Sequence, residues 1–285
     1  MSDEQGGMPP QHQERQPGIE AEMTPRPVDE ARGYLAAGKF KDRVVLITGG
    51  DSGIGKSVAI HFAKEGADVA IAYLDEHQDA ERTKGLIEAE GRRCVLIPGD
   101  LGHEAHARDA VERTVSELGR LDVVVLNASE QHVQKSLEDI DEAQLVKTFR
   151  SNIFSAFFVA KASLKHLKEG ASIIVTTSIT AFRGSDKLID YSSTKGAQLA
   201  FIRALSQSLL DRKIRVNGVA PGPVWTPLIP ASFSEKDVAE FGKSSPMGRP
   251  GQPDEIAPSF IFLASPENTA MTGQVLHPNM GEIVA

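Results

Sequence analysis

The chain has 285 residues, of which 40% are hydrophobic and 25% charged, with a formal net charge of −8. An acidic chain of this kind is not expected to take nucleic acid as its main partner, and a single cysteine, Cys94, excludes an intrachain disulfide. No stretch approaches the roughly 20 apolar residues that cross a bilayer, and the first residues lack an apolar signal core, so we expect a cytoplasmic protein with no membrane partner.

Residues 1–38 differ in composition from the rest of the chain. They hold five prolines among Gln, Glu and Gly, few apolar residues and no periodicity. This composition predicts an extended or disordered arm, and disorder is the preferred interpretation up to Gln16. From Pro17 to Tyr34 a second interpretation is open, in which the arm is anchored on the domain or on a neighbouring subunit. The anchors would then be Met23, Pro25, Pro27, Tyr34 and Leu35.

Strand-like and helix-like segments alternate over residues 39–285. The expected strands are Val44–Ile47, Asp68–Tyr73, Arg93–Ile97, Leu121–Leu126, Ser172–Thr177, Ile214–Val219 and Gln274–Leu276. The expected helices are Lys56–Glu65, Gln78–Glu90, Glu104–Leu118, Ser151–Lys168, Tyr191–Leu210 and Pro253–Ala264. Such alternation implies right-handed crossovers between parallel strands. We therefore predict a single Rossmann-type, doubly wound α/β domain, with a parallel sheet of about seven strands and helices on both faces.

Three glycines, Gly49, Gly53 and Gly55, stand between the first strand and the first helix. Glycine allows a sharp turn and lets a phosphate approach the backbone amides closely. A helix N-terminus adds free N–H groups and the positive end of a dipole. Strand, glycine turn and helix together predict a dinucleotide site.

A second pattern, Tyr191-Ser-Ser-Thr-Lys195, puts a phenol and an amine on one face of a helix. A nearby ammonium favours the phenolate and lowers a pKa that is ordinarily about 10. Such a pair by itself is usually a solvated helix face. Ser178 favours a functional interpretation, because it follows a buried strand at the sheet edge where ligands bind. Asn152 is unfavourable within a helix, so it is either functional or satisfied locally.

These motifs occur in the order and spacing of the short-chain dehydrogenase/reductase family, which the chain resembles over residues 39–284. The matching residues are Thr48, Gly49, Gly53, Gly55, Asn127, Ala128, Asn152, Ser178, Tyr191, Lys195, Pro221 and Gly222. Within the family, the chain is most similar to a glucose/ribitol dehydrogenase-like bacterial branch with a Pro-rich N-terminal arm. That closer similarity rests on residues 49–55, 191–197, 214–228 and 246–253.

The resemblance implies an NAD(P)-dependent oxidoreductase that transfers a hydride between nicotinamide and the carbon of an aldehyde, ketone or sugar-like alcohol. It implies that Tyr191 is the acid/base and that Ser178 stabilises the substrate oxygen. Lys195 would tune Tyr191, and Asn152 would hold a water. Two alternatives are open: reduction of a C=N bond in an iminium or hemiaminal, and a non-catalytic dinucleotide-binding protein.

The resemblance also implies a cofactor site. Its expected residues are Gly49, Asp51, Ser52, Gly53, Ile54, Gly55, Tyr73, Leu74, Asp100, Leu101, Asn127, Ala128, Ser129, Tyr191, Lys195, Pro221, Gly222, Val224 and Thr226. Tyr73 stands where NAD-preferring relatives carry Asp or Glu, and Leu74 where NADP-preferring relatives often carry Arg. We expect NADP(H) or NAD(H), with a slight lean to NADP(H), and no metal.

Leu126, Ser129 and Met280 depart from the family pattern, which usually has Asn, Gly and Gly at these positions. These departures put the local geometry near the cofactor and the substrate in question. The Pro-rich segment Trp225–Ser245 is expected to form a substrate lid.

The expected partners are a small-molecule substrate and further copies of the chain. The family resemblance implies a homotetramer, built partly through the long helices near Ser151–Lys168 and Tyr191–Leu210.

Overall fold

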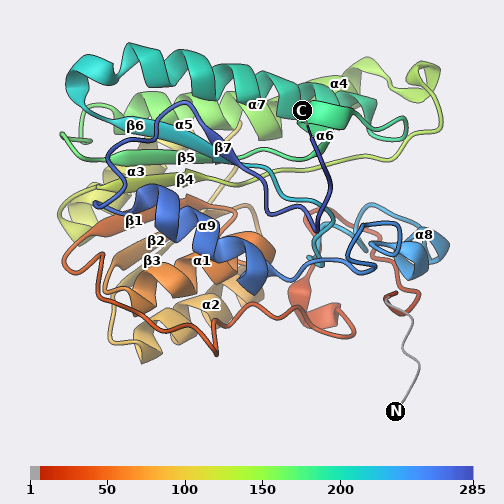
Figure 1. Cartoon of the computed structure of the whole chain (residues 1–285), viewed down its shortest axis with the longest axis horizontal. Coiled ribbons are helices and arrows are strands. Elements are labelled where there is room, and N and C mark those ends of the chain that lie inside the picture. Colours follow the sequence, from red (N-terminus) through yellow and green to blue (C-terminus); the bar gives the residue numbers. More distant parts are fainter. Residues whose placement is uncertain (1–6, 285) are drawn as a thin grey trace.

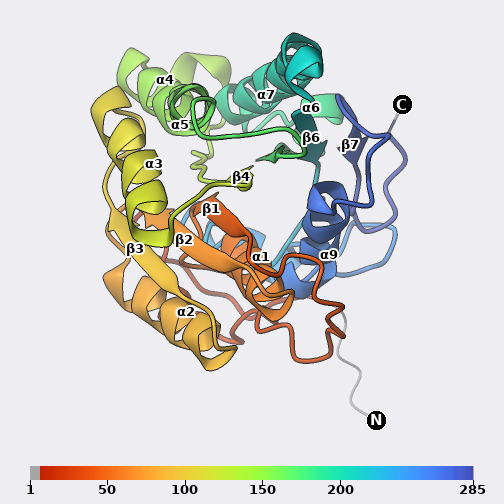
Figure 2. The same cartoon turned by 90° about the vertical axis from the view of Figure 1, so that its left-hand side faces the viewer.

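The fold is a parallel β-sheet between two layers of helices (Figures 1 and 2). The computed structural model describes residues 7–284. The strands are β1 (Val44–Thr48), β2 (Asp68–Tyr73), β3 (Cys94–Pro98), β4 (Val123–Leu126), β5 (Ser172–Thr176), β6 (Arg215–Val219) and β7 (Val275–Leu276). They pair in the order β3-β2-β1-β4-β5-β6-β7, and each pairing is parallel. The predicted doubly wound, Rossmann-type fold is confirmed.

The helices divide between the two faces of the sheet (Figure 2). One face is covered by α1 (Gly53–Lys64), α2 (His77–Ala89) and α9 (Pro253–Ala264), the other by α3 (Glu104–Leu118), α4 (Glu142–Phe149), α5 (Ser155–Ser163) and α7 (Ile189–Ser208). Two short helices, α6 (Thr180–Arg183) and α8 (Glu235–Glu240), lie in the connections after β5 and β6. No helix in the described part of the chain is long and apolar enough to cross a membrane.

The central strands are buried on both faces because their side chains are aliphatic and often β-branched. Val45 and Ile47 of β1 pack toward α1 and α9. Val44 and Leu46 point to the opposite face, toward α3 and α5. Because both sets are apolar, polarity alone does not set the register of β1. The parallel pairing with β2 and β4, in which Thr48 lies opposite Ala72 and Leu126, places the carboxyl ends of the three strands side by side.

The predicted helix over Ser151–Lys168 is wrong in its bounds. The helical segment begins earlier, at α4, where the Asp141 side chain accepts a hydrogen bond from Gln144 N at 2.8 Å and so caps the helix. It passes through a π-helical turn at Arg150–Phe154 and ends with α5 at Ser163. A π turn inserts one extra residue into the helix, and such turns occur frequently at functional sites.

The arm lies against the domain, with one short 3-10 turn at Glu20–Glu22 (Figure 1). Met23 is buried against Trp225, whereas Leu35 is 92% exposed and anchors nothing. The expectation of disorder up to Gln16 is wrong for residues 7–16, because Gln13 N donates to Pro230 O at 2.8 Å; its part over residues 1–6 lies outside the described residues. Hydrogen bonds to main-chain carbonyls hold this polar segment, and composition does not report such contacts.

Candidate active site

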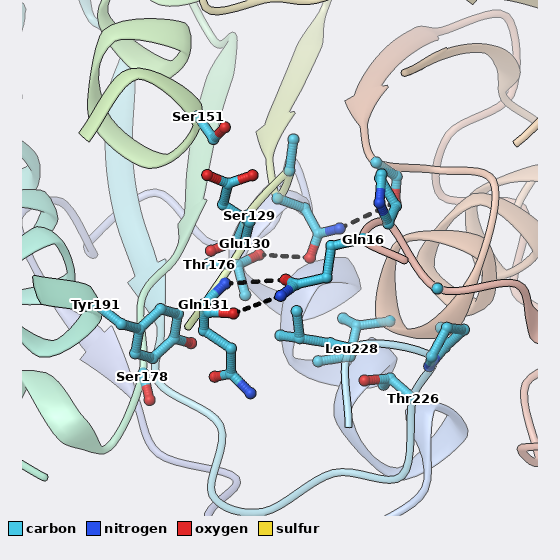
Figure 3. A pocket seen from close by; sticks show the side chains of 18 of the residues that line it. Gln16, Ser129, Glu130, Gln131, Ser151, Thr176, Ser178, Tyr191, Thr226 and Leu228 are labelled. Atoms are coloured by element: carbon cyan, nitrogen blue, oxygen red, sulfur yellow. Dashed lines mark hydrogen bonds between the residues drawn. The ribbon is translucent and has the colours of Figure 1, made fainter. Parts of the chain in front are cut away.

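A cavity of about 400 Å³ opens at the carboxyl ends of the strands (Figure 3). The sheet order reverses between β1 and β4, which is where open α/β sheets bind ligands. Every predicted cofactor residue except Gly55 lines this cavity. Ser178, Tyr191 and Lys195 line it as well, whereas Asn152 does not. The fold therefore brings the glycine turn and the predicted reactive side chains into one space.

The glycine turn has a backbone that side chains would obstruct. Gly49 and Gly53 have positive φ values of 61° and 53°. A Cβ on Gly55 would lie 1.8 Å from Gly49 O, so Gly55 serves the site by closing the turn rather than by lining the cavity. The turn aims the first amides of α1 at the cavity, a cradle that fits a pyrophosphate. The first of these amides is already paired, since Gly53 N donates to Glu20 Oε2 at 3.0 Å.

A hydrogen-bonded strut braces β1 against β4 and β5. Thr48 Oγ1 accepts from Asn127 N at 2.9 Å, and Asn127 Nδ2 donates to Gly49 O at 3.0 Å. Asn127 Oδ1 accepts from Thr176 Oγ1 at 3.0 Å. Leu126 instead packs in the apolar layer beside α3. The bracing that the departure at Leu126 put in question is therefore supplied by Asn127 and Thr48.

Tyr191 and Lys195 project from the first half of α7, and Ser178 follows β5. Tyr191 is 8% exposed and Lys195 1%. Lys195 Nζ lies 5.3 Å from the centre of the Tyr191 ring and donates to Thr176 O at 2.9 Å. Ser178 lies next to the Tyr191 hydroxyl (Figure 3). The spacing along α7 places Tyr191 and Lys195 on one helix face, and the carboxyl end of β5 places Ser178 beside them.

Burial controls the protonation of this group. It raises the pKa of Tyr191 to about 12, and the Ser178 hydroxyl acts in the opposite direction. Burial lowers the pKa of Lys195 to about 7. Desolvation therefore opposes the lowering of the phenol's pKa that the sequence pattern suggests. At neutral pH the phenol carries its proton and is ready to donate it.

Asn152 sits in the π-helical turn and is fully buried. Its Nδ2 donates to Glu130 O and to Thr194 Oγ1, both at 3.0 Å. Its Oδ1 accepts from Glu130 N at 2.9 Å, and its main-chain oxygen accepts from Gln198 Nε2 at 2.8 Å. Of the two interpretations drawn from the sequence, these contacts agree with the one in which the polar groups of Asn152 are hydrogen-bonded within the protein. Asn152 fixes the loop after β4 from behind the cavity.

The arm and the loop after β4 contribute residues that the sequence did not predict. Gln16, Pro17 and Gly18 line the cavity, as do Glu130 and Gln131. The arm has no periodicity, so its pattern carries no signal for this placement. For the loop, the predicted Ser129 was a usable signal, because the next two residues continue along the same rim.

The segment Trp225–Ser245 borders the cavity through Leu228, Phe233 and Phe241. Trp225 itself is fully buried away from it, and its Nε1 donates to Pro25 O at 2.9 Å. The tryptophan thus ties the arm to this segment. The lid role of the segment stays a prediction.

Comparison with known proteins defines the class. A family model described as enoyl-(acyl carrier protein) reductase matches residues 49–282. The chain belongs to the short-chain dehydrogenase/reductase family and is an oxidoreductase.

Among individual proteins, the chain is 57% identical to the uncharacterized oxidoreductase YhdF of Bacillus subtilis, over 98% of this chain and 96% of that protein. It is 50% identical to the glucose and ribitol dehydrogenase of Daucus carota, over 98% of each. A short-chain dehydrogenase from Burkholderia cenocepacia, solved in complex with NADP, is 31% identical with a TM-score of 0.80, over 85% of this chain and 98% of that one. A nicotinamide dinucleotide cofactor is thereby supported.

Proposed function

We propose that the chain catalyses reversible hydride transfer between NAD(H) or NADP(H) and the carbonyl or alcohol carbon of a small aldehyde, ketone or sugar-like substrate. The observation that carries the proposal is the single cavity shared by the glycine turn, Ser178, Tyr191 and Lys195. A bound nicotinamide dinucleotide supplies or accepts the hydride.

The side chains of the protein then manage the proton and the charge. In reduction, Tyr191 donates its proton to the substrate oxygen as the carbonyl carbon gains a hydride, and the product is an alcohol. Ser178 donates a hydrogen bond to the same oxygen and stabilises its developing charge. Lys195 holds its amine beside the phenol and tunes it. In oxidation, the tyrosinate accepts the proton from the alcohol.

The test measures turnover of a panel of substrates through the change in absorbance of the reduced nicotinamide. The panel holds aldehydes, ketones, sugars and sugar alcohols, each with both cofactors. We expect turnover of carbonyl compounds in one direction and of alcohols in the other. Tight dinucleotide binding without turnover of any compound would instead favour the non-catalytic dinucleotide-binding protein.

Reduction of a C=N bond is the second catalytic candidate. The same proton donor serves a nitrogen, so the geometry of Tyr191 and Ser178 favours neither bond. A cyclic imine added to the panel separates them. Faster reduction of the imine than of every carbonyl compound would replace the carbonyl assignment.

We also propose a cytoplasmic homotetramer, with residues 1–38 as an arm on the domain of residues 39–285. Support comes from an apolar surface that includes Phe154 and Phe157, which are 42% and 51% exposed. Phe157 packs against Phe201 of α7, with ring centres 4.3 Å apart. Light scattering coupled to gel filtration tests the assembly, and a monomer in solution would contradict it.

A further inference from the structure

Gln131 lies in the loop after β4, and the arm holds its backbone. Gln16 Nε2 donates to Gln131 O at 2.7 Å, and Gln131 N donates to Gln16 Oε1 at 3.3 Å (Figure 3). Behind the loop, Asn152 fixes the neighbouring Glu130 main chain. The backbone of Gln131 is thus held from both sides, which fixes the point from which its side chain enters the cavity.

The side chain of Gln131 extends into the cavity on the side of Tyr191 and Ser178 (Figure 3). Gln131 is only 4% exposed. Within residues 7–284, its side-chain amide has no hydrogen-bond partner. Its side-chain oxygen and nitrogen are not among the fully buried unpaired atoms of the described residues, so the amide is open to the cavity. A polar group of a bound substrate can therefore pair with it.

The chemistry of the Gln131 amide and of the residues around it indicates which ligand group can bind there. An amide offers both a donor and an acceptor, which matches a hydroxyl. A carboxylate or phosphate is disfavoured, because Glu130 shares the same rim. In the described part of the chain, the cavity's cations are Lys195, placed beside Tyr191, and Arg183, whose Nη1 lies 2.6 Å from Glu282 Oε1.

We propose that Gln131 binds a hydroxyl group close to the reacting carbonyl, and that Gln16 of the arm positions Gln131 for this contact. The preferred substrates are then neutral hydroxy-aldehydes, hydroxyketones or sugars rather than plain aldehydes. This inference rests on the proposed oxidoreductase function. It makes the arm a part of the active site rather than a cover on it.

The experiment compares glyceraldehyde with propanal, which has the same carbon chain without hydroxyls. We expect kcat/KM to favour glyceraldehyde by about tenfold or more, since a site built to bind a hydroxyl rejects the analogue that lacks it. Gln131→Leu should collapse this ratio toward one. Gln16→Ala should lower the ratio to an intermediate value, whereas a loss of general stability would lower both rates by the same factor. Gln207→Leu, on the exposed face of α7, is the matched control.

The remaining outcomes separate the two claims. Turnover with an unchanged ratio in Gln131→Leu overturns the role of Gln131 and leaves the proposed function standing. Weakened NADH and NADPH binding in that variant would assign Gln131 to the cofactor instead. Where no compound is turned over, the proposed function fails. Calorimetric titration of the protein–dinucleotide complex with ribitol then tests the hydroxyl contact, and absence of binding overturns it.

A second observation concerns the end of the cavity beside β2. The charged residues that line it there are Asp51 in the glycine turn and Glu76 before α2. They are 5% and 3% exposed. Burial raises the pKa of Asp51 to about 8, and the charge of Glu76 acts in the same direction. Arg15 of the arm is paired with Asp75, and its charge also acts on Glu76. Tyr73, where a carboxylate would be expected, instead bonds through its hydroxyl to His77.

We infer that Asp51 and Glu76 take the place of the carboxylate missing at position 73, and that the site prefers NAD(H). Because the pKa of Asp51 is raised to about 8, Glu76 is the member of the pair that carries the negative charge at neutral pH. A carboxylate there accepts a hydrogen bond from the ribose hydroxyl of NAD(H) but repels the phosphate that NADP(H) carries at the same position. This replaces the slight lean to NADP(H) drawn from the sequence, which weighed Tyr73 and Leu74 without the burial of Asp51.

Fluorescence titration of the wild-type protein with NADH and NADPH tests this without turnover. We expect NADPH to bind about tenfold or more weakly, as like charges are brought together. Glu76→Gln should narrow the difference in affinity between NADH and NADPH, and Leu74→Arg should tighten NADPH binding. Asp109→Asn, on the exposed face of α3, is the control. Equal or tighter binding of NADPH by the wild type overturns the inference. If Arg15→Ala then abolishes NADPH binding, Arg15 is the residue that binds the phosphate of NADPH.

Discussion

The arm and the carboxyl edge of the sheet border the same cavity, but different forces hold them. The sheet edge is positioned by strands whose side chains are buried on both faces, so many apolar contacts share the task. The arm has few apolar anchors and relies on single polar contacts. Lys56, 1% exposed, bonds to Glu20 and lies 3.1 Å from Asp29 Oδ1, both of them arm residues.

This difference shows how a polar segment can become part of an active site. Truncating one side chain of an apolar layer costs about 2–5 kcal/mol, but the many remaining contacts of the layer still hold the strands in place. A buried charge cluster does not, since removing one partner leaves the other charges unpaired. The arm should therefore be sensitive to single changes, and the chemistry at the sheet edge should survive changes that loosen the arm.

The largest expected effect is on the chemistry of the sheet edge. Tyr191→Phe removes the proton donor and should lower kcat by about 10³-fold or more, within the range of general acid–base catalysis. Dinucleotide binding, measured by fluorescence titration, should persist. Tyr34→Phe is the matched control in the arm: it removes the hydroxyl that bonds to Glu65, far from the reaction. A normal rate in Tyr191→Phe would refute the proposed acid/base.

The next largest effect is on the attachment of the arm. Lys56→Met leaves Glu20 and Asp29 buried without their cation, which should destabilise the fold by about 3–5 kcal/mol in urea unfolding. Lys161→Met removes an exposed pair with Glu104 and should cost less than about 1 kcal/mol. Equal losses of unfolding free energy in the two variants would show that the buried cluster stabilises the fold no more than the exposed pair does.

A pH profile sharpens the assignment of Tyr191. Burial raises its pKa to about 12. The protonated form, needed for reduction, therefore dominates at neutral pH, and the ionised form, needed for oxidation, grows as pH rises. Between about pH 7 and pH 10, alcohol oxidation should accelerate, whereas carbonyl reduction should stay level or fall. An oxidation rate independent of pH would contradict this role.

The smallest effect tests the link between the arm and the segment after β6. Trp225→Phe keeps the aromatic ring and removes the hydrogen bond to Pro25 O, which should cost about 1 kcal/mol. The looser arm should then be cleaved faster by trypsin at Arg26 and Arg32. Equal cleavage rates in the variant and the wild type would show that this bond does not hold the arm.

Sequence patterns predicted the sheet and most of its edge because those features are local or periodic. The apolar run of β1 and the glycines after it give a strand and a turn without reference to distant residues. Tyr191 and Lys195 share a helix face by spacing alone. The bounds of α4 and α5 were missed because an asparagine in a π-helical turn, satisfied by Glu130 and Thr194, breaks the regular period.

The amino-acid sequence by itself determined the fold class and was enough to predict which side chains gather at the cavity, because strand burial, helix spacing and glycine geometry are properties of neighbouring residues. Only the tertiary structure decided that Gln16 clamps Gln131, that Glu20 pairs with Lys56 and that Asp51 faces Glu76. Each of these contacts joins polar residues from separate segments. Polar contacts of this kind follow no period along the chain, and they form only once the apolar layers have fixed the distances between the segments.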